Sequence, residues 1–244
     1  MSAADEAAEL LEAAAGDRSR LEAMVARRLT GEPLAWITGG VEFCGIRIKL
    51  AAGVYVPRWQ TEALARRAAR RLPENGLAVD VCCGSGAISA VLAARRPGAR
   101  LLATDVDPRA VACARANGVD ARIGDLFEGL PADLCGTVDL VTGVVPYVPT
   151  AELGLLQRDT FAFEKALAYD GGPDGLVIAW RAVAGAAQWL RPGGALLLEL
   201  GGQQVTELEL DCFEDVVVLR DEVGDARGVE ATRVPDREPV AHTR

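Results

Sequence analysis

Residues 79–93, VDVCCGSGAISAVLA, place a glycine-rich turn between a short apolar run and an alanine-rich segment. Gly84 and Gly86 permit a tight turn and let a ligand approach the backbone closely. The first N–H groups of a helix that follows would have no partners within that helix. Ser89 stands where a G-x-G-x-x-G dinucleotide fingerprint has its third glycine. The pattern indicates either a cofactor site that departs from this fingerprint or a turn that needs glycine for its own geometry.

Asp105 closes the next apolar run, LLATD. At the end of a strand beside the glycine turn, its carboxylate can accept hydrogen bonds from both hydroxyls of a ribose. The alternative is that Asp105 caps a helix, although Asp107 is better placed for the cap because Pro108 follows it. After the third predicted strand, residues 124–127, GDLF, lie where they could line a base pocket.

Composition excludes several other kinds of site. His242 is the one histidine, which argues against a serine–histidine triad, a histidine base and a histidine-ligated zinc ion. The net charge of −9 argues against nucleic acid as a partner, since such partners are bound through basic side chains. The acidic N-terminus and the lack of a run of about 18 apolar residues predict a cytoplasmic protein without membrane contact. The oligomeric state stays open.

The six cysteines form no C-x-x-C pair, and Cys82 and Cys83 are adjacent. We expect free thiols that serve as small core residues in a reducing compartment, and no metal site.

Hydrophobic periodicity predicts the elements that position these residues. Amphipathic helices are expected at 3–15 and 19–30, and residues 42–50, EFCGIRIKL, alternate like a hairpin. Strands are then predicted at 77–81, 101–105, 121–125, 138–143, 195–200, 215–220 and 228–233. Helices are predicted at 61–71, 87–96, 108–117 and 176–190, and residues 191–194 connect the last of them to the strand at 195–200. This alternation predicts an α/β protein with a doubly wound sheet. Residues 1–55 would form a helical and hairpin attachment, 56–234 the main domain and 235–244 a tail.

Longer motifs resemble one family. In addition to the glycine turn, five segments resemble the release-factor glutamine methyltransferases (HemK-type), which are class I S-adenosylmethionine-dependent methyltransferases. These segments are RRLTGEPLAWITGGVEFCGIRIKL (27–50), VPRWQTE (56–62), DGGPDGL (170–176), LRPGGALLLELGGQQV (190–205) and VGDARGVEATR (223–233). The resemblance implies a Rossmann-like doubly wound seven-stranded sheet and S-adenosylmethionine as cofactor. The cofactor contacts that it implies fall on Cys82, Cys83, Gly84, Ser85, Gly86, Asp105, Val106, Asp125, Leu126 and Val144, with Leu126 beside the adenine.

The resemblance breaks at the acceptor signature. The family's Asn-Pro-Pro-Tyr corresponds to Val144, Val145, Pro146 and Tyr147 here. In the family, the asparagine and a prolyl carbonyl hold the target –NH₂ and aim its lone pair at the methyl group, so catalysis is positioning. Valine offers no side-chain acceptor, and a site built for hydrogen bonds loses about 1–3 kcal/mol when one partner disappears.

We therefore predict a methyltransferase with an altered acceptor, such as a small molecule, for which residues 144–147 are the catalytic positions. A genuine release-factor glutamine methyltransferase and a non-catalytic cofactor-binding protein are the alternatives. The short stretch before Arg27 predicts a reduced bundle for recruiting a protein substrate.

Several further side chains allow two interpretations each. Tyr147 lines the acceptor pocket or stands on its rim, and Glu199 approaches the acceptor or caps a loop. Trp59 and Gln60 cover the cofactor or pack elsewhere. The run Phe161–Phe163–Glu164 admits substrate or is packing.

Overall fold

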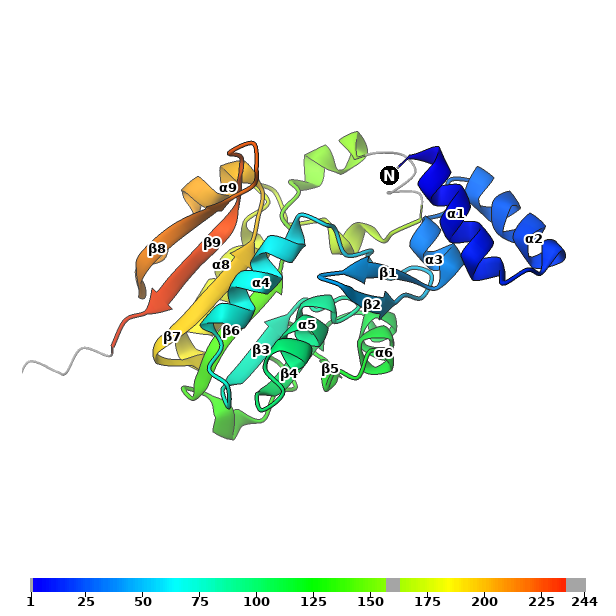
Figure 1. Ribbon diagram of the computed structural model, residues 1–244. Coiled ribbons are helices and arrows are strands. Elements are labelled where there is room, and N and C mark those ends of the chain that lie inside the picture. Colours follow the sequence, from blue (N-terminus) through cyan, green and yellow to red (C-terminus); the bar gives the residue numbers. More distant parts are fainter. Residues whose placement is uncertain (1, 157–162, 236–244) are drawn as a thin grey trace, which may run out of the picture.

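The computed structural model describes residues 2–156 and 163–235 (Figure 1). It begins with the two predicted helices, α1 (Ala3–Ala14) and α2 (Arg18–Leu29). Ser2 and Asp17 cap them, because each side chain accepts a hydrogen bond from a backbone N–H of the first turn. A short helix that the sequence pattern does not predict, α3 (Leu34–Thr38), follows Pro33. The buried sides of the three helices share a small core of Leu10, Ala14, Met24, Leu34 and Ile37.

The predicted hairpin is confirmed as β1 (Gly40–Phe43) and β2 (Ile46–Lys49), which pair antiparallel. Cys44 and Gly45 form its turn, and both have positive φ, as a type I′ hairpin turn requires. Phe43 and Ile48 are 1% exposed and belong to the same core cluster as residues of α4 and α5. The hairpin is thus anchored to the main sheet, while the division of the chain after residue 55 stays a prediction.

A seven-stranded sheet follows, in the order β5-β4-β3-β6-β7-β9-β8. Its strands are β3 (Leu77–Val81), β4 (Arg100–Asp105), β5 (Ala121–Ile123), β6 (Val138–Val144), β7 (Leu190–Glu199), β8 (Phe213–Arg220) and β9 (Ala226–Arg233). The first five are parallel, and β9 runs antiparallel to both of its neighbours, so the sheet is mixed. The strand order reverses beside β3.

Helices cover both faces of the sheet, which confirms the doubly wound class (Figure 1). On one face lie α4 (Thr61–Arg71), α5 (Ala87–Arg95) and α6 (Pro108–Ala116), and on the other lies α8 (Val177–Trp189). The chain also forms the helix α9 (Gly202–Glu207) and the short 3₁₀ turns η1 (Ala132–Leu134), η2 (Thr150–Leu155) and η3 (Ala166–Ala168). Successive strand residues point to opposite faces, so Leu197 packs with α4 and α5, and Leu196 and Leu198 pack with α8.

Three expectations need correction. Residues 191–194, predicted to connect a helix to the strand at 195–200, lie inside β7, because Leu190 already pairs with Val138 ahead of an irregularity in the ladder. The helix α9 was not expected. All six cysteines are free, but Cys135 and Cys212 are exposed and so are not core residues.

No helix among the described residues is long and apolar enough to cross a membrane. Residues 236–244 of the predicted tail, which include His242, lie outside the described part of the chain.

Candidate active site

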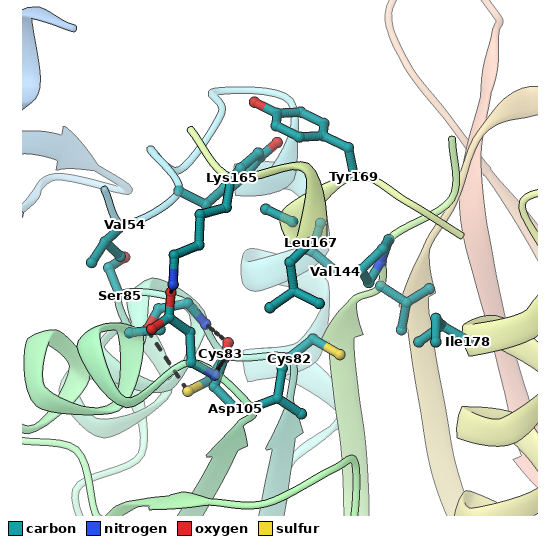
Figure 2. A pocket seen from close by; sticks show the side chains of 18 of the residues that line it. Val54, Cys82, Cys83, Ser85, Asp105, Val144, Lys165, Leu167, Tyr169 and Ile178 are labelled. Atoms are coloured by element: carbon teal, nitrogen blue, oxygen red, sulfur yellow. Dashed lines mark hydrogen bonds and ion pairs between the residues drawn. The ribbon is translucent and has the colours of Figure 1, made fainter. Parts of the chain in front are cut away.

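A cavity opens at the carboxyl ends of β3, β4 and β6 (Figure 2). Two covering segments complete it, residues 53–61 ahead of α4 and residues 165–170 ahead of α8. In open α/β sheets, ligands bind at this edge where the strand order reverses. The topology therefore places a ligand site at the glycine turn.

The glycine turn serves both packing and access. Cys82, Gly84 and Gly86 all have positive φ. A Cβ atom on Gly86 would stand 3.0 Å from Ala114 and Val119, whereas nothing lies within 4 Å of a Cβ built on Gly84. Gly86 is thus needed for the packing of α5, and Gly84 leaves the backbone accessible from the cavity.

Cys82 and Cys83 line the cavity but do not form a dithiol site. Figure 2 shows their sulfur atoms pointing to opposite sides. Cys82 packs against the α8 face of the sheet and Cys83 against the cluster beneath α6. Among residues 2–156 and 163–235, no group of three or more His, Cys, Asp or Glu residues could hold a metal ion.

Asp105 is fixed by the backbone. Its two oxygens accept hydrogen bonds from the N–H groups of Gly84 and Asp107, both at 2.9 Å. Asp107 caps α6, since its Oδ1 atom accepts from the Arg109 N–H at 3.0 Å. The alternative that Asp105 is the helix cap is therefore wrong. Asp105 lines the cavity, and burial raises the pKa of its carboxyl.

Ser89 explains why the third glycine of the dinucleotide fingerprint is absent. Its hydroxyl donates to Oδ2 of the buried Asp80 at 2.8 Å, and the Thr142 hydroxyl donates to Oδ1 at 3.1 Å. Burial raises the pKa of Asp80 to about 6. This carboxyl joins β3, β6 and α5 beneath the cavity, a role that no sequence pattern indicates.

The predicted adenine side is assembled from Val106, Asp125 and Leu126, which all line the cavity. The Leu126 carbonyl accepts a hydrogen bond from the Thr104 hydroxyl, and Asp125 forms an ion pair with Arg181 at 2.9 Å. Phe127 instead stacks on Trp189, with ring centroids 5.8 Å apart, and is not a cavity residue.

The four positions of the acceptor signature, residues 144–147, all line the cavity. Val145 is 1% exposed, and Val144 pairs with Glu199 across β6 and β7. Burial raises the pKa of Tyr147, which favours the pocket over the rim. Glu199 lies behind this wall, since it is 7% exposed and does not line the cavity. Burial raises its pKa to about 7, although a hydrogen bond from Thr61 and the charge of Arg227 oppose the shift.

A polar network joins the two covering segments. One Arg58 nitrogen donates to Glu164 Oε2 at 2.7 Å and to the Tyr169 hydroxyl at 3.0 Å. The Tyr169 hydroxyl also contacts Glu164, whose other oxygen accepts from the Val56 N–H at 2.8 Å. The guanidinium lies 4.7 Å above the Tyr55 ring, which meets the Tyr169 ring edge-on. Two segments that lie far apart in the sequence thereby form one roof over the cavity.

The remaining candidates fall outside the cavity. Trp59 is 65% exposed, and neither Trp59 nor Gln60 lines the cavity, although both belong to the covering segment 53–61. Phe163 packs edge-on against Trp36, which confirms the packing interpretation, and Phe161 lies outside the described residues. Tyr55 and Tyr169 line the cavity as well as the predicted Tyr147, but these two isolated tyrosines carry no spacing signal that could have identified them.

Comparison with known proteins agrees with this geometry. The sequence pattern of the Methyltransferase small domain family matches residues 58–138. A release factor glutamine methyltransferase of Geobacter sulfurreducens is 39% identical over 202 residues, which cover 78% of this chain and 71% of that protein. A 4-amino-L-phenylalanine/4-methylamino-L-phenylalanine methyltransferase of Streptomyces pristinaespiralis is also 39% identical, over 75% of this chain and 66% of that protein.

Among solved structures, a 16S rRNA N2 G1207 methyltransferase of T. Thermophilus, in complex with AdoMet and guanosine, superposes with a TM-score of 0.54. It is 20% identical and covers 82% of this chain and 46% of its own. At this identity the likeness supports the fold alone, a class I methyltransferase sheet.

Proposed function

The chain belongs to the release factor glutamine methyltransferase family of S-adenosylmethionine-dependent methyltransferases, and from this premise we propose that it methylates a small molecule rather than a protein glutamine. One observation carries the proposal. Val144 and Val145 form the cavity wall where the family's acceptor signature has asparagine and proline. A glutamine amide placed there would lack a side-chain hydrogen-bond partner.

The cofactor side fits S-adenosylmethionine. We propose that the accessible backbone at Gly84 faces the cofactor, that Asp105 binds its ribose hydroxyls and that Leu126 packs against its adenine. When bound, this cofactor supplies an electrophilic methyl group on a sulfonium, so the donor needs no further activation. The remaining cofactor contacts would come from Cys82, Cys83, Ser85, Gly86, Val106, Asp125 and Val144.

On the acceptor side the protein would act by positioning. We propose that the backbone carbonyls at 144 and 145 accept a hydrogen bond from an N–H or O–H of the acceptor. The aliphatic side chains of Val144, Leu167 and Ile178 line the cavity and would keep water from the reacting atoms. Holding two reactants at near-attack distance lowers the barrier by about 7–11 kcal/mol in well-oriented cases.

Methylation of a release-factor glutamine is the second candidate, supported by relatives such as the Geobacter sulfurreducens protein. The relative from Streptomyces pristinaespiralis has the same identity to this chain, and its name gives a free amino acid as the methyl acceptor. Relatives at this sequence identity therefore act on either kind of acceptor, so identity alone does not decide between the two candidates. The residues at 144 and 145 favour the small molecule.

Methyl-labelled S-adenosylmethionine distinguishes the candidates. The purified protein is incubated with a bacterial peptide-chain release factor in one reaction and with a panel of small amines, including 4-amino-L-phenylalanine, in another. We expect label on a small amine and none on the release factor. Label on the release-factor glutamine alone would establish the second candidate. Tight cofactor binding without transfer to any acceptor would favour a non-catalytic cofactor-binding protein.

A further inference from the structure

Lys165 extends from the roof of the cavity to the wall that carries the proposed cofactor side. It belongs to the covering segment 165–170, and Figure 2 shows its side chain extending toward the wall that carries Asp105. Its Nζ atom donates to Asp107 Oδ2 at 2.7 Å. Since Asp107 caps α6 on the far wall, this ion pair bridges two elements that approach the cavity from different sides.

The ammonium contacts Asp107, two residues beyond the Asp105 carboxylate that is proposed to bind the ribose. Asp105 and Asp107 are two residues apart, and the positive charge of Lys165 acts on both carboxyls. Arg109 also approaches Asp107 Oδ2, at 3.5 Å, but its side chain is about half exposed. A lysine ammonium has three N–H donors, and the Asp107 contact uses one of them. Among the described residues the ammonium makes no other hydrogen bond, so its other donors can reach a polar group beside Asp105.

We propose that Lys165 is a cofactor-binding residue whose ammonium donates to a ribose hydroxyl that Asp105 also holds. This inference rests on the proposed function, because it places S-adenosylmethionine at Asp105. It adds a donor from the acceptor side of the cavity to a carboxylate acceptor from the cofactor side.

The position of Lys165 couples the two halves of the site. Leu167, Ala168 and Tyr169 follow it closely and line the cavity. The Tyr169 carbonyl accepts from the Val148 N–H at 2.8 Å, which fastens the segment directly beyond the acceptor signature. A cofactor held by Lys165 therefore orders the acceptor wall, and by linkage an acceptor bound to that wall strengthens cofactor binding equally.

Calorimetric titration with S-adenosylhomocysteine tests the contact. We expect Lys165→Met to weaken binding about tenfold or more, as for loss of a charge-assisted hydrogen bond, and Lys165→Arg to restore part of it. The matched control is Lys49→Met, since Lys49 is the other lysine and its Nζ atom donates to the Ala116 carbonyl at 3.3 Å on the exposed surface. With an analogue that lacks the ribose hydroxyls, Lys165→Met should weaken binding far less. An equal loss with both ligands, or no loss, would overturn the proposal.

Hydrogen exchange separates this inference from the proposed function. In the unaltered protein, S-adenosylhomocysteine should slow amide exchange at residues 82–86 and at residues 163–170. In Lys165→Met, at saturating ligand, protection should persist at 82–86 and be lost at 163–170. Equal protection of 163–170 in both proteins would refute the role of Lys165 and leave the cofactor site intact. Protection of neither segment in the unaltered protein would refute the cofactor site itself.

Discussion

At the scale of single residues, the Asp105 carboxylate is held from behind by two backbone N–H groups at 2.9 Å. Asp105 also lines the cavity, and its carboxylate has further lone pairs that can accept hydrogen bonds from a ligand. We expect Asp105→Ala to weaken S-adenosylhomocysteine binding by about 10- to 100-fold, because a partly buried charged acceptor is lost. Calorimetric titration measures this.

Asp120→Ala, which removes an exposed carboxylate paired with Arg122, is the matched control and should bind normally. Thermal unfolding of both variants checks that the fold persists, since Asp105→Ala leaves the Gly84 and Asp107 N–H groups without that partner. Unchanged cofactor affinity in a folded Asp105→Ala protein would contradict the ribose assignment.

Val144 is the residue that decides between acceptors. Val144→Asn would place an amide on the cavity wall beside the retained Pro146 and Tyr147. We expect it to raise labelled methyl transfer to a release-factor glutamine from background by about 10-fold or more, the worth of one hydrogen bond in a site that requires it. Val144→Leu, which changes size without adding a donor or acceptor, should give no gain. If Val144→Asn also gives none, the rest of the acceptor side differs from a glutamine site.

At the scale of elements, the turn from β3 to α5 contains two glycines with different roles, one in packing and one in ligand access. Gly86→Ala adds left-handed strain at φ 76 and brings a Cβ to 3.0 Å from Ala114 and Val119. We expect a loss of about 2–4 kcal/mol in the free energy of unfolding. Gly84→Ala adds strain at φ 54 but meets no atom within 4 Å, so it should cost about 1–2 kcal/mol.

Cofactor titration should give the opposite order. Gly84→Ala should weaken S-adenosylhomocysteine binding more than Gly86→Ala does, because its methyl group enters the space left open at the turn. Urea unfolding and calorimetry on both variants provide the two rankings. The same ranking in both measurements would show that the two glycines share one role.

The sequence predicted those elements whose periodicity or apolar content is local. The strands β3, β4 and β6 are short apolar runs between helices, so their places were clear. The helix α3 could not be predicted in this way. Four of its five residues, Leu34, Ala35, Trp36 and Ile37, are buried, so the segment has no polar face and shows no helical periodicity. The start of β7 depends on the pairing of Leu190 with Val138, a tertiary contact that a local Pro-Gly-Gly sequence hides.

The candidate site divides in the same way. Asp105 and Val144 end their strands, and residues 82–86 and 145–147 directly follow strand ends. The topology of a parallel sheet brings such ends together. Tyr55, Lys165 and Tyr169 lie on connections whose path over the sheet depends on the Arg58–Glu164 ion pair and on contacts such as Val148 to Tyr169. No local pattern encodes these pairings, so the roof of the cavity required the structure.

At the scale of the whole molecule, buried carboxyls make the stability depend on pH near neutrality. Burial raises the pKa of Glu199 from 4.5 to about 7. A raised pKa means that the folded state binds the proton more tightly than the unfolded state. The stability from this group is therefore complete below about pH 4.5 and is lost as the pH rises through 7. Asp80, with a pKa of about 6, acts in the same direction.

The variant Glu199→Gln isolates one of these groups, because glutamine resembles the protonated acid and does not titrate. Between pH 5 and pH 8 the unfolding free energy of the unaltered protein should fall relative to that of Glu199→Gln, by up to about 3 kcal/mol. Urea unfolding at both pH values measures the difference, in which the contribution of Asp80 cancels. The control variant is Glu222→Gln, which replaces an exposed carboxyl. Its unfolding free energy should differ from that of the unaltered protein by the same amount at both pH values. If Glu199→Gln also does so, the carboxyl is not protonated in the folded protein, and water must reach it behind the acceptor wall.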